Sequence, residues 1–235
     1  MVQWNRSLPW RVVIPSLSIL ALVAVAVPLL AQWSGKAQRD AISQLGALRA
    51  VVDLDDDQNV RLLRIPPGGS LKALEHMAAL PRLKMLVLPL TDAGDDDLAH
   101  LRGSAALEEL ILSGNHRITD EGLKHLRGLP NLKALYLTDV PINGSGLKYL
   151  SGLEHLELLN LAFTQITDAN LVNASGLKAR KFLDMIGTQI SDAGLDHLRG
   201  LKKLERLVVT GARVTPAGAE KLKQSLPHVD VKFGR

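Results

Sequence analysis

The sequence contains no cysteine, and aromatic residues make up only 3% of its 235 residues. Without cysteine there is no disulfide framework, no thiolate metal ligand and no cysteine nucleophile. With so few aromatic side chains, the core must be built from one aliphatic residue type used many times, and leucine is abundant. These two deficits favour a repetitive aliphatic fold.

The sequence also lacks a basic stripe with interleaved aromatic residues. Its formal net charge is +4, but basic residues are scattered among acidic ones, which argues against a nucleic-acid partner. No Ser-His-Asp arrangement, phosphate loop or nucleophile elbow can be recognised. We therefore expect no enzymatic activity, no cofactor, no metal site and no small-molecule substrate.

Charge is absent between Arg11 and Lys36, and residues 12–31 are apolar apart from two serines. Such a run is long enough to cross a hydrocarbon core of about 30 Å as a helix. All three tryptophans flank it, as is common at membrane interfaces. We expect a transmembrane helix over 12–33 in a single-pass membrane protein, with the rest of the chain outside the cytoplasm. A cleaved signal sequence, giving a secreted protein, is the alternative.

From residue 83 onward, six windows share one template at intervals of 24 or 25 residues. They read LKMLVL at 83, LEELIL at 107, LKALYL at 132, LELLNL at 156, RKFLDM at 180 and LERLVV at 204. The fourth and sixth positions of each window are apolar, and this period of two predicts a short strand with one buried face.

A short helix is expected after each strand. Its start is indicated by Thr or Ser followed by Asp, as in Thr119-Asp120, Thr167-Asp168 and Ser191-Asp192, because a hydroxyl caps a helix and an acid favours its positive end. Glycines follow the helical leucines and are expected to end the helices in a left-handed conformation. They are Gly103, Gly128, Gly152, Gly176 and Gly200.

One strand and one short helix cannot bury their own apolar faces, so the units must stack. Stacking places a parallel sheet on the concave side and the helices on the convex side, because strands lie closer together than helices. The pattern LxxLxL followed by ITDxGLxxLxGL resembles the leucine-rich repeat family, in its Thr-Asp-x-Gly-Leu variety. It is similar to membrane-anchored, planctomycete-like bacterial members. The resemblance implies an α/β leucine-rich repeat solenoid that binds proteins.

Upstream of the repeats, residues 38–48 read as an amphipathic helix and 51–65 as two strands joined by a polar turn at 55–58, a unit that would cap the array. The expected organisation is an N-terminal flank at 1–11, the transmembrane helix or signal sequence at 12–33, a linker and capping unit at 34–65, and the repeat domain at 66–235. Asp53, Asp55 and Asp57 resemble the start of a calcium loop only weakly, since Gln58 and Arg64 replace the required glycine and glutamate.

Side chains alternate along a strand, so the third and fifth positions of each window face the concave surface. Many of them are large and apolar, which marks an interaction surface. The predicted partner-binding residues are Glu109, Ile111, Tyr136, Leu158, Asn160, Phe182, Asp184 and Arg206. The predicted function is a membrane-anchored, non-catalytic protein–protein interaction module. A self-associating structural protein of the cell envelope is the alternative.

Overall fold

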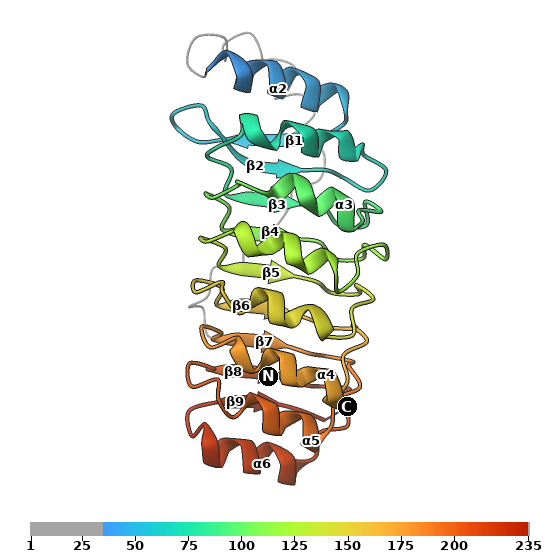
Figure 1. Cartoon of the computed structure of the whole chain (residues 1–235), viewed down its shortest axis with the longest axis vertical. Helices are drawn as coiled ribbons and strands as arrows, with labels where there is room; N and C mark the ends of the chain where they lie inside the picture. Colours follow the sequence, from blue (N-terminus) through green and yellow to red (C-terminus); the bar gives the residue numbers. More distant parts are fainter. Residues whose placement is uncertain (1–34, 235) are drawn as a thin grey trace, which may run out of the picture.

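The computed structural model describes residues 35–234, which form one curved stack of repeats (Figure 1). Nine strands make a single sheet in chain order from β1 to β9. The pairing of β1 with β2 is antiparallel, and every later neighbouring pair is parallel. The predicted α/β solenoid is therefore confirmed.

The strands are short and regularly spaced. Their bounds are β1 Val51–Leu54, β2 Val60–Arg64, β3 Met85–Val87, β4 Glu109–Ile111, β5 Ala134–Tyr136, β6 Leu158–Asn160, β7 Phe182–Asp184, β8 Arg206–Val208 and β9 Asp230–Lys232. Matching positions of successive repeats pair directly, so each repeat position forms a column that runs across the sheet.

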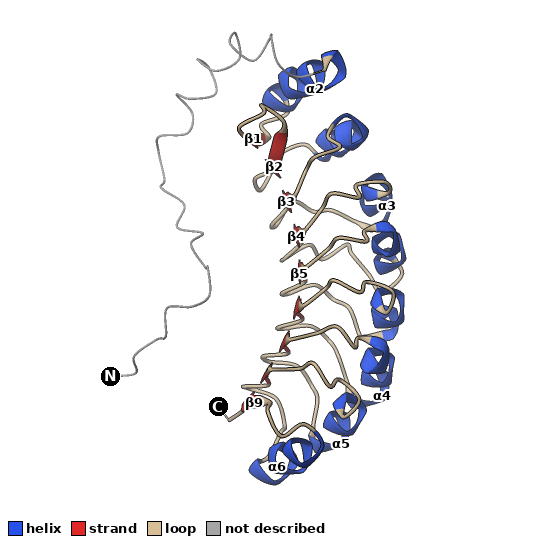
Figure 2. Ribbon diagram, turned by 90° about the vertical axis from the view of Figure 1, so that its left-hand side faces the viewer, coloured by secondary structure: helices blue, strands red, loops and turns tan. Residues whose placement is uncertain are grey.

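The helices are also short, and many are 3-10 helices. Their bounds are α2 Lys36–Ala47, η2 Leu71–Ala79, α3 Asp95–Leu98 with η3 Ala99–Leu101, η4 Gly122–Gly128, η5 Ser145–Leu150, α4 Asp168–Leu171 with η6 Val172–Gly176, α5 Asp192–Leu195 with η7 Asp196–Leu198, and α6 Pro216–Ser225. Figure 2 shows the helices on the outer side of the curve and the strands on the inner side.

The core is one continuous layer of aliphatic side chains between sheet and helices. The fourth and sixth residues of every window are fully buried, as the alternation predicts; they are Leu86, Leu88, Leu110, Leu112, Leu135, Leu137, Leu159, Leu161, Leu183, Met185, Leu207 and Val209. The helix leucines close the layer from the other side, for example Leu123 and Leu126 in η4. Each repeat thus buries its leucines mainly against its neighbours.

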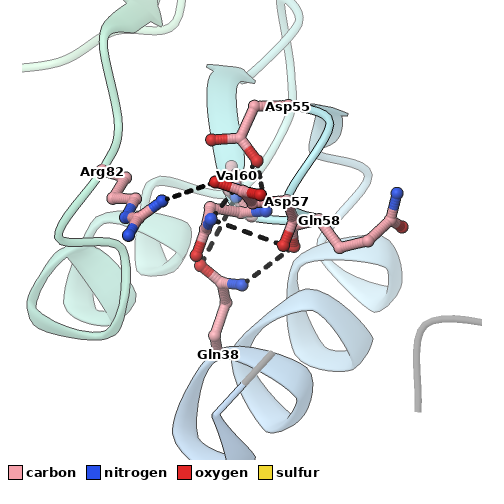
Figure 3. Close-up of polar contacts among 7 residues, drawn as sticks. Gln38, Asp55, Asp57, Gln58, Val60 and Arg82 are labelled. Atoms are coloured by element: carbon pink, nitrogen blue, oxygen red, sulfur yellow. Dashed lines mark hydrogen bonds and ion pairs between the residues drawn. The ribbon is translucent and has the colours of Figure 1, made fainter. Parts of the chain in front are cut away.

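The N-terminal end of the stack is covered by helix α2 and the antiparallel hairpin β1–β2. Gln38 of α2 is buried, and its amide donates to the Gln58 carbonyl (3.1 Å) and accepts from the Val60 N–H (3.4 Å), as Figure 3 shows. In the hairpin turn Asp55 accepts from the Asn59 N–H (2.8 Å), and Asp57 forms an ion pair with Arg82 (3.1 Å). These acids therefore stabilise the turn by contacts within the protein.

The structure contradicts the predicted location as a single-pass membrane protein. Within residues 35–234 no helix is long and apolar enough to cross a membrane. Helix α2, with 12 residues, is the longest there, and at about 1.5 Å per residue it spans roughly 18 Å against the 30 Å required. The predicted span at 12–33 lies outside the described residues, so what the structure supports is the repeat fold alone.

The predicted left-handed glycine at each helix end is wrong in four of five cases. Only Gly103 has a positive φ, of 86°. The other helices end with a tight 3-10 turn, in which the N–H of the following leucine donates to the carbonyl three residues earlier, as from Leu129 to Leu126 (3.1 Å). This turn satisfies the last carbonyl without a left-handed residue.

The residues of the Thr-Asp-x-Gly-Leu signature form a contact between successive repeats. Asp168 accepts from the Ser191 N–H (2.7 Å) and the Ser191 hydroxyl (2.5 Å), both in the next repeat. A Cβ at Gly194 would lie 2.3 Å from Asp168 Oδ1, so the glycine makes room for the carboxylate. Asp95 accepts from Thr119 in the same way, and Asp192 accepts from Thr215. The aspartate was expected to favour its own helix, but it also fixes the start of the next one.

At one junction both the aspartate and the glycine of this contact are replaced. Gly144 stands where other repeats have the aspartate, and Asn170 stands where the next repeat would have the glycine. A Cβ at Gly144 would lie 3.4 Å from the Asn170 Cβ, so the asparagine occupies the space that a carboxylate takes elsewhere. Thr167, which caps α4, accordingly makes no side-chain cap hydrogen bond. Loss of the acid and loss of the glycine therefore occur together.

Arg180 replaces the first leucine of its window. Its side chain is buried, and its guanidinium donates to the carbonyls of Leu150 (3.1 Å), Leu153 (3.2 Å) and Leu156. Burial lowers the pKa of Arg180 to about 10, so the group stays cationic at neutral pH. The carbonyls at the end of η5 thus hold a buried cation in place of a leucine.

Asn115 ties two turns together. Its side chain is fully buried and accepts from the backbone N–H groups of Thr91 (2.9 Å) and Ala93 (3.0 Å), while it donates to the carbonyls of Leu88 (2.6 Å) and Leu112 (2.8 Å). Thr188, at the matching position, donates only within its own turn, to Met185 (2.8 Å). Of these two matching turn residues, only Asn115 therefore connects successive repeats.

We predict that Asn115→Ala lowers the free energy of unfolding by about 3 kcal/mol, because buried donors and acceptors in two repeats lose their partners. Thr188→Ala is the matched control and should cost about 1 kcal/mol. Urea denaturation followed by circular dichroism measures both. Equal losses for the two variants would contradict the bridging role of Asn115.

We also predict that Asp168 and Gly194 are energetically coupled. Gly194→Ala should cost about 1–3 kcal/mol beside Asp168, because the new methyl group overlaps the carboxylate. In an Asp168→Ala background the same change should cost at least about 1 kcal/mol less. Gly200→Ala, whose Cβ would meet nothing within 4 Å, serves as the control and should change stability little. Additive effects in the double-mutant cycle would refute the coupling.

Candidate functional site

The concave face is formed by two columns of strand side chains that point away from the core. Strand pairing places Glu109, Ala134, Leu158, Phe182 and Arg206 next to one another in the first column. The second column is Ile111, Tyr136, Asn160, Asp184 and Val208. The structure therefore brings all eight predicted contact residues onto one surface. Whether a partner uses them is a separate matter.

The centre of this face is apolar. Ile111, Tyr136, Leu158 and Phe182 lie on four successive strands from β4 to β7, and each is partly exposed. The core does not require these side chains, since the buried face of each strand is already filled by leucines. A contiguous apolar patch of this kind is typical of an interaction surface.

The polar residues of the second column are bonded to one another. Asn160 accepts from the Thr138 hydroxyl (2.9 Å) and donates to Asp184 (3.3 Å), and Asp184 also accepts from the Ile186 N–H (3.0 Å). Asp184 is only 9% exposed, so it offers less surface than the alternation predicts. Burial raises the pKa of its carboxyl, partly offset by the Ile186 N–H.

Glu109 and Tyr136 form a second polar pair on adjacent strands. Burial raises the pKa of Glu109, and a hydrogen bond with Tyr136 acts in the opposite direction. The pKa of Tyr136 is raised by burial and by the neighbouring carboxylate. Arg206, at the other end of the column, is ion-paired with Asp230 of β9 (3.3 Å). The face thus has an apolar centre, with Glu109 on β4 and Asp184 on β7 at its sides.

A column of alternating charges lies beside the concave face, at the second position of each window. Its members are Lys84, Glu108, Lys133, Glu157, Lys181 and Glu205. Glu108 pairs with both Lys84 (3.2 Å) and Lys133 (2.6 Å), and Lys181 pairs with Glu157 (2.9 Å). The sequence shows this alternation once the windows are aligned. Lys84, Lys133 and Lys181 are therefore ion-paired with glutamates of neighbouring repeats.

Sequence reasoning also missed two exposed apolar residues in the turns after the strands. Leu90 is 59% exposed and Phe163 is 60% exposed. Both have a left-handed backbone, with φ of 53° and 58°. The matching residues of the other repeats are glycine or aspartate: Gly114, Asp139, Gly187 and Gly211. The contrast between leucine or phenylalanine and glycine or aspartate at one repeat position is visible in the sequence and could have identified these two residues. We call these six residues the turn rim.

The repeated histidines lie on the convex side and make no cluster. His125 contacts Arg102 (3.2 Å), and burial together with this guanidinium lowers the pKa of the imidazole. No group of three or more histidine, aspartate or glutamate side chains placed to hold a metal ion occurs within residues 35–234.

Comparison with known proteins agrees with this geometry. A family model described as Leucine Rich repeat matches residues 104–126, and solved structures with the same architecture are leucine-rich repeat proteins. The chain thus contains leucine-rich repeats, as predicted. The Thr-Asp-x-Gly-Leu subtype and the planctomycete-like resemblance stay predictions. Comparison with curated protein sequences gives no match.

Three solved structures illustrate the similarity in fold. An internalin of Listeria monocytogenes has 23% identity and a TM-score of 0.54 over 67% of this chain, which spans 43% of that internalin. Internalin C2 of the same species has 20% identity and a TM-score of 0.57, covering 84% of this chain and 92% of its own. The Toll–Spatzle complex of Drosophila has 18% identity and a TM-score of 0.53, covering 68% and 21%.

We predict that Glu109→Gln stabilises the fold slightly at neutral pH. A carboxyl with a raised folded pKa binds its proton more tightly in the folded state, so it lowers stability as pH rises through its unfolded and folded pKa values. The variant should gain less than about 1 kcal/mol at pH 7, because solvent screens a half-exposed group. It should gain nothing at pH 3. Thermal unfolding at both pH values tests this, and a gain that is equal at the two would be inconsistent with it.

Proposed function

We propose that this chain is a non-catalytic protein–protein interaction module that binds its partner through the concave face. The observation that carries the proposal is the apolar patch on β5, β6 and β7, where Leu158 pairs with Phe182 and Tyr136 lies diagonally across from Leu158, two residues further along its own strand. The fold does not need large apolar side chains at these positions, because the leucines on the other side of each strand form the core. Aromatic groups on an exposed rigid sheet are typical binding anchors.

The rigidity of the sheet supports the same function. Each strand is hydrogen-bonded to both neighbours from β2 to β8, and the core behind the sheet is continuous. Side chains on such a scaffold lose little conformational freedom when a partner binds, so more of the contact energy appears as affinity. The Toll–Spatzle complex contains a chain of similar fold within a protein assembly, which gives the proposal an architectural precedent.

Partner binding should be lost when the aromatic anchors are removed. We expect Tyr136→Ser and Phe182→Ser together to weaken binding at least about 100-fold, since each buried aromatic anchor contributes roughly 2 kcal/mol or more. Proximity labelling followed by affinity measurement with the purified partner provides the readout. Lys124→Ser with Glu220→Ser, two exposed residues on convex helices, is the matched control.

The result contrary to this proposal is retention of every partner by the Tyr136→Ser and Phe182→Ser variant while it remains folded. Analytical ultracentrifugation of the same variants separates a second possibility, in which the apolar face joins copies of this chain. In that case the wild-type protein forms an oligomer, and the variant is a monomer.

A further inference from the structure

Between β3 and β7 the charged side chains of the concave face are all acidic; Arg206 lies outside this stretch, on β8, where it is ion-paired with Asp230. From β3 to β7, the two concave columns and the turn rim hold three carboxylates, Glu109, Asp139 and Asp184. The same residues include no lysine and no arginine, although the chain as a whole carries a net charge of +4. An acidic surface on a basic chain is complementary to a cationic ligand.

These carboxylates also lack cationic partners within the protein. Among residues 35–234, Glu109 and Asp184 form no ion pair, and Asp139 faces only the His116 imidazole at 3.8 Å. The neighbouring cations are engaged elsewhere, as with Lys133 on Glu108 (2.6 Å). Asp139 is exposed, but Glu109 and Asp184 lie among half-buried apolar groups, where a charge without a counter-ion is unfavourable. An incoming cation would relieve that cost.

The turn rim gives an independent indication of contact. A left-handed backbone costs a residue such as leucine or phenylalanine roughly 1–2 kcal/mol, and exposing the side chain adds nothing in return. Leu90 lies over Gly114 and Phe163 over Gly187, since a Cβ on either glycine would come within 2.6 Å of these side chains. The fold accepts glycine or aspartate at the same positions, so the large apolar groups serve a purpose outside the fold.

Two spacings across the sheet agree with each other. Glu109 on β4 and Asp184 on β7 are three strands apart, and so are Leu90 and Phe163 in the turns after β3 and β6. At about 4.8 Å per strand, Leu90 and Phe163 are separated by roughly 14 Å. Asp184 lies two residues further along its strand than Phe182, the residue in register with Glu109, so Glu109 and Asp184 are roughly 16 Å apart. An extended chain that crosses the strands covers either distance with about four to five residues at roughly 3.3 Å each.

On the basis of the proposed function, we propose that the partner places a cationic, aliphatic segment on the concave face. Lysine or arginine side chains about four to five residues apart pair with Glu109 and Asp184, and the aliphatic side chains contact Tyr136 and Phe163. The carboxylates provide selectivity for charge, while the apolar groups provide most of the affinity.

The test is a selection with a phage-displayed library of random twelve-residue peptides on the immobilised full chain. A parallel selection uses the folded variant Tyr136→Ser with Phe182→Ser, so that only peptides dependent on the concave face are counted. We expect lysine and arginine to be enriched at least about threefold in these peptides, with aliphatic residues between them. The selected peptides are then titrated against Glu109→Gln with Asp184→Asn, which should weaken binding at least about tenfold.

Glu75→Gln with Glu220→Gln removes the same charge from the convex helices and should leave binding unchanged. Peptides that need Tyr136 and Phe182 but are neutral or acidic overturn the cationic assignment and leave the proposed function standing. Peptides that bind both chains equally well count against the concave face itself. A selection that recovers no peptide, or equal weakening by the convex control, also overturns the assignment.

Discussion

Each repeat buries its leucines mainly against the repeats beside it, and the rest of the structure depends on this constraint. A unit of three strand residues and one or two helical turns is too small to enclose an apolar core. Stacking solves this by placing matching leucines in columns, such as Leu110, Leu135 and Leu159, all fully buried. Curvature follows, because strands approach more closely than helices, and Figure 2 shows the sheet on the inner side.

The same constraint explains why contacts between repeats are specific. A stack held only by leucines could slide by one repeat with little loss, since successive leucine columns are alike. Asn115 bonds the turn at Thr91 whereas Thr188 bonds only within its own turn, and lysine alternates with glutamate in the column that contains Lys133 and Glu108. These polar contacts specify the order of the repeats, which the similar leucine columns of the core do not distinguish.

Stacking also leaves one surface free of structural demands. The core uses the inward side chain of each strand, so Tyr136, Leu158 and Phe182 can be chosen for another purpose. The turn rim shows this most clearly, because Phe163 is both exposed and held in a backbone conformation that favours glycine. A stable array thus provides a rigid surface whose composition is not set by the core.

The sequence by itself determined the repeat, the strand faces and the concave columns, because these depend on periods of two and of about 24 residues that are visible in one dimension. It did not determine the ends of the helices, where Gly128 stays out of the left-handed region because a 3-10 turn already satisfies the carbonyl. It could not show that Asp184 is nearly buried beside Asn160, or that Gly194 makes room for Asp168, because each pair is brought together only by stacking. Tertiary structure decided these contacts, since their partners lie one whole repeat apart in the chain.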